Sequence, residues 1–260
     1  MSASAQPWLD RLDLDEMPTV DLQQLTQAAD LQRRFDAKYL VPLERLPELL
    51  TGLGHDLRVL EVDGRRSTDY TSVYFDTANL RSYHDHLKRR RRRFKVRTRH
   101  YGDEAGTMLE VKCKGRQERT VKHRWPHTGP SPSSLGAEAE QRVAQTLWDQ
   151  YGFHLPEALE PTAITRFERF TLVDIEAVER ITVDLGLVIE ANGRQVQLGD
   201  NQAIVEVKAA LRRGRATRAI GELGLRPRSM SKYCVGLMAV DERVRGNPWI
   251  PTLRRLVREC

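Results

Sequence analysis

The chain has 260 residues, of which 40% are hydrophobic and 30% charged, so its length allows one large domain or two small ones. Its net charge of +6 suits an anionic partner but is far too small for a protein that coats nucleic acid with positive charge. No run of about 18 apolar residues is present, which excludes a membrane span, and the acidic start lacks the apolar core of a signal peptide. The cysteines Cys113, Cys234 and Cys260 are scattered, so we expect a reduced, cytoplasmic protein without a zinc cluster.

The first predicted elements follow a polar start. Residues 1–30 are weakly periodic, with one short helix expected near 21–29, and we interpret them as a tail or peripheral helix before a single domain over residues 31–260. Residues 33–41 alternate as a strand does, and Pro42 ends that strand. Leucines spaced along residues 43–53 then predict a helix that stops at Gly54.

The rest of the chain consists mainly of short predicted strands with a few helices. In chain order these are a strand at 68–76, a short helix at 79–88, a basic strand at 94–99, a hairpin of 107–114 and 119–125, a linker at 130–136, a helix at 138–151, strands near 163–173, 181–189 and 203–209, and helices near 216–223 and 232–240. Asp76 is expected to cap the helix that follows it. Short connections favour antiparallel pairing, so the elements predict a mainly β fold with helices (α+β), namely an antiparallel β-barrel.

The most basic stretch is KRRRRRFKVRTRH at residues 88–100, which has nine Lys and Arg between Lys88 and Arg99. Its second half alternates strictly, so Lys95, Arg97 and Arg99 are expected on one strand face, opposite the residues between them. Residues 89–93 are expected in the turn that enters this strand. There they form either an electrostatic funnel for polyanions or a solvated loop, and both interpretations stay open.

Charged and apolar residues alternate on the other predicted strands as well, with Glu110 and Lys112, for example, opposite Val111. The ordinary interpretation is a solvated face above an apolar core. However, like charges about 4 Å apart repel by roughly 4 kcal/mol at an effective dielectric of 20. A strand face with this many bases therefore needs carboxylates or a polyanion beside it to neutralise the positive charge. The leucine-rich helices offer cover for the apolar strand faces from outside. This favours a barrel with a charged lumen, suited to a phosphate chain and a divalent metal.

Eight short motifs run in a recognisable order over residues 33–240. They are RFDAKY (34–39), VYFDT (73–77), KVRTR (95–99), LEVKCK (109–114), TRFERF (165–170), ITVD (181–184), IVEVK (204–208) and SKYCVG (231–236). In these motifs the chain resembles the VTC domain, the polyphosphate-polymerising module of vacuolar transporter chaperone complexes, within the triphosphate tunnel metalloenzyme superfamily. The resemblance implies an antiparallel eight-stranded β-barrel tunnel with a charged lumen and helices packed outside.

The resemblance also implies that a set of lumenal bases holds phosphates. Arg97 and Arg99 would grip the triphosphate of a nucleotide, and Lys208 and Lys232 would complete the catalytic group. The other implied substrate contacts are Lys38 at a tunnel entrance, Lys112, Lys122, Arg166, Arg180 and Ser231.

By the same resemblance, Glu206 would hold a divalent metal, Mn or Mg. Glu110 would be either a second metal ligand or an ion-pair partner for a neighbouring base, and we favour the ion pair. The hydrolase and cyclase branches of the superfamily open with Glu-x-Glu-x-Lys, where this chain has RFDAK at residues 34–38. A base replaces one acid and the other acid is shortened, which weakens a two-metal interpretation and favours the VTC branch.

These features predict a metal-dependent polyphosphate polymerase that transfers the γ-phosphoryl group of ATP to a growing chain. Such a transfer needs alignment and charge neutralisation, and no side-chain base, because the attacking phosphate is already anionic. Two alternatives stay open: a tripolyphosphate or nucleoside triphosphate hydrolase of the same fold, and a module that binds polyphosphate or inositol phosphates without turnover. DNA or RNA binding is disfavoured because few aromatics interleave with the basic strands. Coupling to export would need a separate membrane partner.

Overall fold

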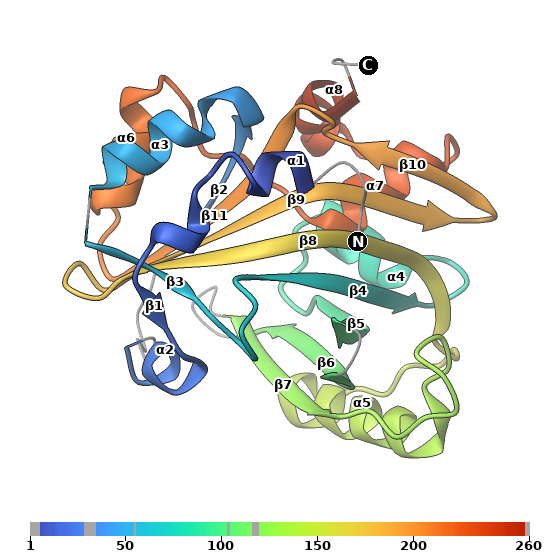
Figure 1. Cartoon of the computed structure of the whole chain (residues 1–260). Coiled ribbons are helices and arrows are strands. Elements are labelled where there is room, and N and C mark those ends of the chain that lie inside the picture. Colours follow the sequence, from blue (N-terminus) through green and yellow to red (C-terminus); the bar gives the residue numbers. More distant parts are fainter. Residues whose placement is uncertain (1–5, 29–34, 55, 103–104, 116–119, 258–260) are drawn as a thin grey trace.

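The computed structural model describes residues 6–28, 35–54, 56–102, 105–115 and 120–257 (Figure 1). Its main strands are β2 (Phe35–Pro42), β4 (Ser67–Asp76), β5 (Phe94–Tyr101), β6 (Ala105–Lys114), β7 (Thr120–Pro126), β8 (Glu160–Asp174), β9 (Glu179–Ala191) and β11 (Gln202–Ala209). They form one sheet in the order β2-β11-β9-β8-β4-β5-β6-β7, with every ladder antiparallel. The antiparallel pairing of the predicted eight-stranded barrel is thus confirmed, although no ladder among the described residues closes it.

Three additional strands, none of which was predicted from the sequence, extend this sheet. They are β1 (Thr19–Val20), β3 (Leu57–Leu60) and β10 (Arg194–Leu198). β3 joins β1 to β8, and β10 forms a hairpin with β9. In the described part of the chain no ladder joins β2 to β7, so the sheet stays open between these two edge strands. We call this open side of the sheet, which ends in β2 and β7, the seam.

Helices cover the apolar outer face of the sheet, as the charge pattern predicted. Near one end, α3 (Leu46–Leu53), preceded by η2 (Leu43–Arg45), and α6 (Arg215–Glu222) share a core with Tyr39, Val183 and Val205. At the other end, α5 (Gly136–Tyr151) buries Val96 and Val111 beneath it (Figure 1). The residues that alternate with these apolar side chains therefore lie on the inner, concave face.

The helix α7 (Lys232–Val240) packs directly on the concave face, which corrects the prediction that the helices all pack outside. A Cβ atom added to Gly236 would lie 2.6 Å from Cδ1 of Ile189, so the helix and β9 are in close contact. The Tyr233 ring stacks on Tyr74 with centroids 5.1 Å apart. Because α7 occupies this end of the concave face, a ligand bound on the remaining strands lies beside its first turn.

Asp76 ties α7 to α4 (Arg81–Leu87). Its carboxylate accepts hydrogen bonds from the backbone N–H groups of Ser82 at 2.7 Å and Tyr83 at 2.9 Å, and from the Tyr233 hydroxyl at 2.7 Å. The predicted capping role of Asp76 is confirmed, although the helix begins at Arg81.

The termini of the described chain pack on the same body. The N-terminal part contains α1 (Gln6–Leu9), η1 (Leu14–Glu16) and α2 (Leu22–Ala28), and Leu12 and Leu14 are buried in the core shared with α3. The division into a tail and one domain stays a prediction. The C-terminal elements η4 (Asn247–Trp249) and α8 (Ile250–Val257) were not expected from the sequence. Among the described residues, no helix is long and apolar enough to cross a membrane.

Candidate functional site on the concave face

The first cluster of the concave face is centred on Glu110, a side chain with no exposed surface. Arg97 lies opposite it in the β5–β6 register and donates from Nε at 2.8 Å and from Nη2 at 2.5 Å to Oε2. Lys122 reaches Oε1 at 2.5 Å. Burial alone would raise the pKa of Glu110, but Arg97, Arg99 and Lys122 outweigh it and hold the pKa far below its ordinary value. These contacts support the ion-pair role that sequence analysis favoured.

We expect Glu110→Gln to destabilise the fold by about 3 kcal/mol at pH 7, because the buried Arg97 would lose its charged partner. Since the pKa of Glu110 is lower in the folded state than in the unfolded chain, its contribution is complete at neutral pH and declines below about pH 4.5. Urea unfolding of wild type and variant, with metal chelated, measures both effects.

The matched control is Glu190→Gln, which removes the partner of Arg166 from a half-exposed pair and should cost about 1 kcal/mol or less. Equal stabilities of the two variants without metal would contradict the ion-pair role of Glu110.

The second cluster is centred on Asp184 of β9, whose side chain is also fully buried. Arg169 donates to it from Nε at 2.5 Å and from Nη2 at 2.9 Å, and Lys232 at the start of α7 contacts the same carboxylate. Burial would raise the pKa of Asp184, but these two bases hold it below its ordinary value. Lys232 was a predicted site residue, whereas Asp184 and Arg169 were not. The available signal was the ITVD motif, which places Asp184 on the strand face of Arg180.

The third cluster is centred on Glu206 of β11, and it is looser. Its Oε1 lies 3.4 Å from Nζ of Lys38 on β2 and 3.4 Å from Nζ of Lys208 on its own strand. The Glu206 side chain is 17% exposed, unlike those of Glu110 and Asp184. Burial would raise the pKa of Glu206, but Lys208 and Lys38 outweigh it and keep the pKa well below its ordinary value. Glu206 is therefore an ionised carboxylate that a ligand can reach.

Arg99 differs from these clusters because the groups it contacts directly are neutral. Its Nε donates to the Ser72 hydroxyl at 2.9 Å, and its guanidinium lies over the rings of Tyr70 and Phe167 at 5.1 and 5.8 Å. Burial and the adjacent Arg97 lower the pKa of Arg99 to about 10. The side chain keeps its charge at neutral pH, so it presents a strong positive potential to an anion.

A second row of bases completes the concave face. Lys112 lies in register between Lys95 and Lys122 on the neighbouring strands. Arg97 and burial together push the pKa of Lys112 well below its ordinary value, which shows how crowded the positive charge is here. Arg180 lies opposite Lys208 in the β9–β11 register. The fold therefore brings these predicted bases together.

A protein-family model matches residues 33–240, described as the VTC domain. The chain belongs to the VTC-domain family. This confirms the resemblance that the motifs indicated. A search of curated protein sequences gave no match.

Solved structures similar to this VTC domain include one from Hippeastrum, described as an adenylyl cyclase candidate that reveals a dominant triphosphatase activity. It is 14% identical, with a TM-score of 0.50, and the alignment covers 80% of this chain and 97% of the other. A structure from Vibrio parahaemolyticus, described as a candidate adenylate cyclase, is 12% identical with a TM-score of 0.43, covering 80% and 99% of the two chains. At 14% identity, the similarity to the Hippeastrum structure shows a shared tunnel fold and nothing about activity.

Among the predicted site residues, Arg166 lies away from the charged clusters on the concave face of this VTC domain. It lies in register with Thr71, on the face opposite Ser72, and pairs with Glu190 at 2.9 Å on the outer side of the sheet. The inner position on β8 belongs to Arg169. The geometry therefore does not support a phosphate contact for Arg166.

Ser231 caps α7, with Oγ accepting from the backbone N–H of Cys234 at 3.4 Å. This places its hydroxyl next to Lys232.

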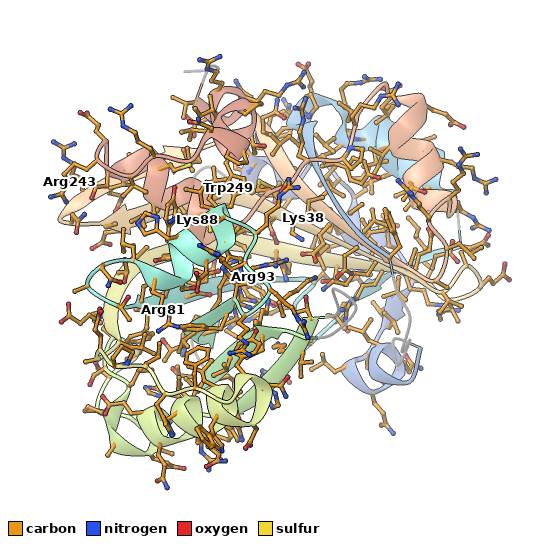
Figure 2. The ribbon with its side chains drawn as sticks, turned by 180° about the vertical axis from the view of Figure 1, so that it is seen from behind. Lys38, Arg81, Lys88, Arg93, Arg243 and Trp249 are labelled. Atoms are coloured by element: carbon orange, nitrogen blue, oxygen red, sulfur yellow. The ribbon has the colours of Figure 1, made fainter. Side chains whose placement is uncertain are left out.

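Residues 89–92 are exposed in the loop before β5, and Figure 2 shows Lys88 and Arg93 at its two ends. Both interpretations of this loop stay open, and Arg34 lies outside the described residues.

A divalent metal fits this site only if phosphate oxygens and water supply most of its ligands. Triphosphate tunnel metalloenzymes generally use such ions, but the described residues contain no group of three His, Cys, Asp or Glu side chains that could hold one. Glu110 and Asp184 already accept short hydrogen bonds from bases. Mg²⁺ is commonly held by one or two carboxylates plus substrate phosphates. The reachable carboxylate of Glu206 fits a metal whose other ligands are phosphate oxygens and water.

Proposed function

We propose that this VTC domain is a metal-dependent polyphosphate polymerase that transfers the γ-phosphoryl group of ATP to a growing polyphosphate chain. The observation that carries the proposal is the excess of bases on the concave face, where even the buried carboxylates are each shared between two bases. A linear polyanion neutralises such a surface along its length. We further propose Mn or Mg as cofactor, a cytoplasmic location and a separate membrane partner for any export.

The chain's own residues would bind and align the phosphates. Arg97 is held rigidly by Glu110 and by the Tyr74 hydroxyl, to which Nη1 donates at 3.0 Å, so its guanidinium is preorganised. Arg99 would bind beside it, while Lys208 and Lys232 approach from the facing strand and helix. A bound metal would neutralise charge on the transferred phosphoryl group.

The proposed reaction needs no general base. A terminal oxygen of the acceptor chain attacks the γ-phosphorus, the bond from that phosphorus to the bridging oxygen breaks, and ADP leaves with that oxygen. A hydrolase must in addition orient a water molecule. The three carboxylates described above, those of Glu110, Asp184 and Glu206, each have a basic partner. This supports transfer to phosphate over transfer to water.

The first test is the ratio of products. We expect ATP to yield ADP with orthophosphate as a minor product, and added pyrophosphate to shorten any lag by serving as the first acceptor. Enzymatic ADP and orthophosphate assays on the same time course measure this. Arg34→Glu, which restores an acid at the first position of the RFDAK motif, should raise the orthophosphate share. Orthophosphate equal to ADP in the wild type would favour the triphosphatase alternative, which the Hippeastrum structure keeps open.

A further inference from the structure

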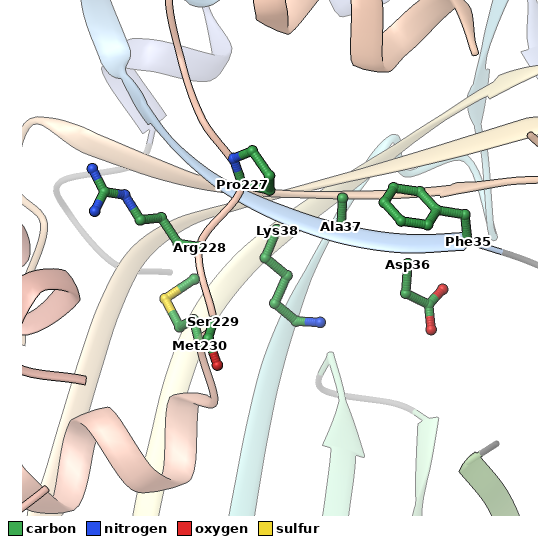
Figure 3. Close-up of a pocket in the computed structure, with 8 residues that line it drawn as sticks. All are labelled: Phe35, Asp36, Ala37, Lys38, Pro227, Arg228, Ser229 and Met230. Carbon is green, nitrogen blue, oxygen red and sulfur yellow. The ribbon is translucent and has the colours of Figure 1, made fainter. Parts of the chain in front are cut away.

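A pocket of about 380 Å³ lies at the seam, between residues 35–38 of β2 and residues 227–230 of the segment leading into α7 (Figure 3). β2 is an edge strand, paired with β11 on one side only within the described sheet. On its other side, the backbone N–H of Arg228 donates to the carbonyl of Lys38 at 2.7 Å. This contact fixes residues 227–230 beside β2, so the pocket is a built feature of the fold. Its volume falls at the lower end of the range for small-ligand sites.

Two cations lie at opposite sides of this pocket. Figure 3 shows the Lys38 ammonium group directed to one side of β2, together with Asp36, while the Arg228 guanidinium is directed the other way. Nζ of Lys38 is 3.4 Å from Glu206, the carboxylate that fits a metal. The pocket therefore lies between Arg228 and the Lys38–Glu206 pair.

The other edge strand of the sheet is basic as well. On β7, the side chains of Lys122 and Arg124 are 41% and 46% exposed. Arg124 lies over the Tyr101 ring at 5.1 Å, which holds its guanidinium close to the concave face. Both edge strands of the described sheet therefore carry bases.

We propose that the seam pocket is an acceptor subsite, which binds the end of a linear polyphosphate chain while the nucleotide triphosphate lies on Arg97 and Arg99. This rests on the proposed polymerase function. Arg228 binds phosphates outside the site, and Lys38 binds the terminal phosphate beside Glu206. A chain end bound in this pocket at the edge of β2 would lie beside Glu206 and the transferred phosphoryl group.

The test compares Arg228→Glu with Arg226→Glu, an exposed base two residues away in the same segment. Titration calorimetry in chelator measures the Kd of a polyphosphate of defined length and the Kd of ATP separately. We expect Arg228→Glu to weaken polyphosphate binding about tenfold, as loss of a charged hydrogen bond does, with ATP affinity unchanged. Arg228→Lys should keep most of the affinity, and Arg226→Glu should behave as wild type. With ATP and metal, Arg228→Glu should also delay chain growth.

Equal polyphosphate affinities for Arg228→Glu and Arg226→Glu would overturn the subsite, as would an equal loss for ATP. A wild-type protein that makes no polyphosphate would contradict the proposed function instead, while the binding comparison still decides the subsite. Melting curves of all variants show whether each remains folded.

Discussion

Glu206→Gln should lower kcat for polyphosphate formation by about 10²–10³-fold, while the protein stays folded and still binds ATP. The side chain is reachable, and its two contacts with lysines are 3.4 Å long, so it contributes little to packing. Without its charge, the two lysines lose their carboxylate and attract phosphate at least as well. Loss of turnover with undiminished nucleotide affinity is the expected signature of a missing metal ligand.

Steady-state rates over a range of Mn²⁺ and Mg²⁺ concentrations, together with ATP titration in chelator, provide the measurement. Glu190→Gln is the control, because it removes a carboxylate of the same size from the outer face of the sheet. Wild-type rates for Glu206→Gln at all metal concentrations would show that Glu206 is not the ligand.

Arg99→Lys should weaken ATP binding about tenfold or more. A guanidinium can donate to two phosphate oxygens at once, whereas an ammonium group is a point charge. The contacts of Arg99 with Ser72 and the rings of Tyr70 and Phe167 are neutral, so the substitution leaves no buried carboxylate unpaired. The affinity should therefore fall without a large loss of stability, which ATP titration and thermal melting measure side by side.

Arg90→Ala is the matched control in the exposed loop before β5. It should change mainly the rate of nucleotide capture at low salt, because exposed charges are screened at higher ionic strength. If Arg90→Ala and Arg99→Lys caused equal losses of affinity at physiological salt, the whole basic stretch would be one surface patch.

Alternation along the strands was enough to predict which side chains share a face. On β5, Val96 is buried under α5, while Arg97 and Arg99 lie on the concave face. The argument from crowded positive charge also predicted the correct side for α3, α5 and α6, because apolar strand faces and leucine-rich helices must cover each other. It was wrong for α7, which packs on the concave face instead.

Alternation within one strand does not say which of its faces is the inner one. On β8, Arg166 and Arg169 lie on opposite faces, and only the register with Ser72 of β4 shows that Arg169 is the inner residue. Phe167, an apolar residue, also faces inward, where it lies beneath the bases Arg99 and Arg169. A sequence rule that places apolar residues outside therefore fails on this strand.

The pairing of bases with carboxylates could not be predicted either, because it depends on which strands are neighbours. Glu110 pairs with Arg97 across the β5–β6 ladder, but Asp184 pairs with Lys232, which comes from a helix far along the chain. The open seam is likewise a property of two edge strands, β2 and β7, that are distant in sequence.

The central claim is tested most directly by incubating the protein with γ-labelled ATP and Mn²⁺ or Mg²⁺, and separating the products by size. The account predicts a ladder of labelled polyphosphate that lengthens with time, together with unlabelled ADP, and no ladder with Glu206→Gln. Label found only in orthophosphate, or ATP left intact while polyphosphate binds tightly, would contradict it.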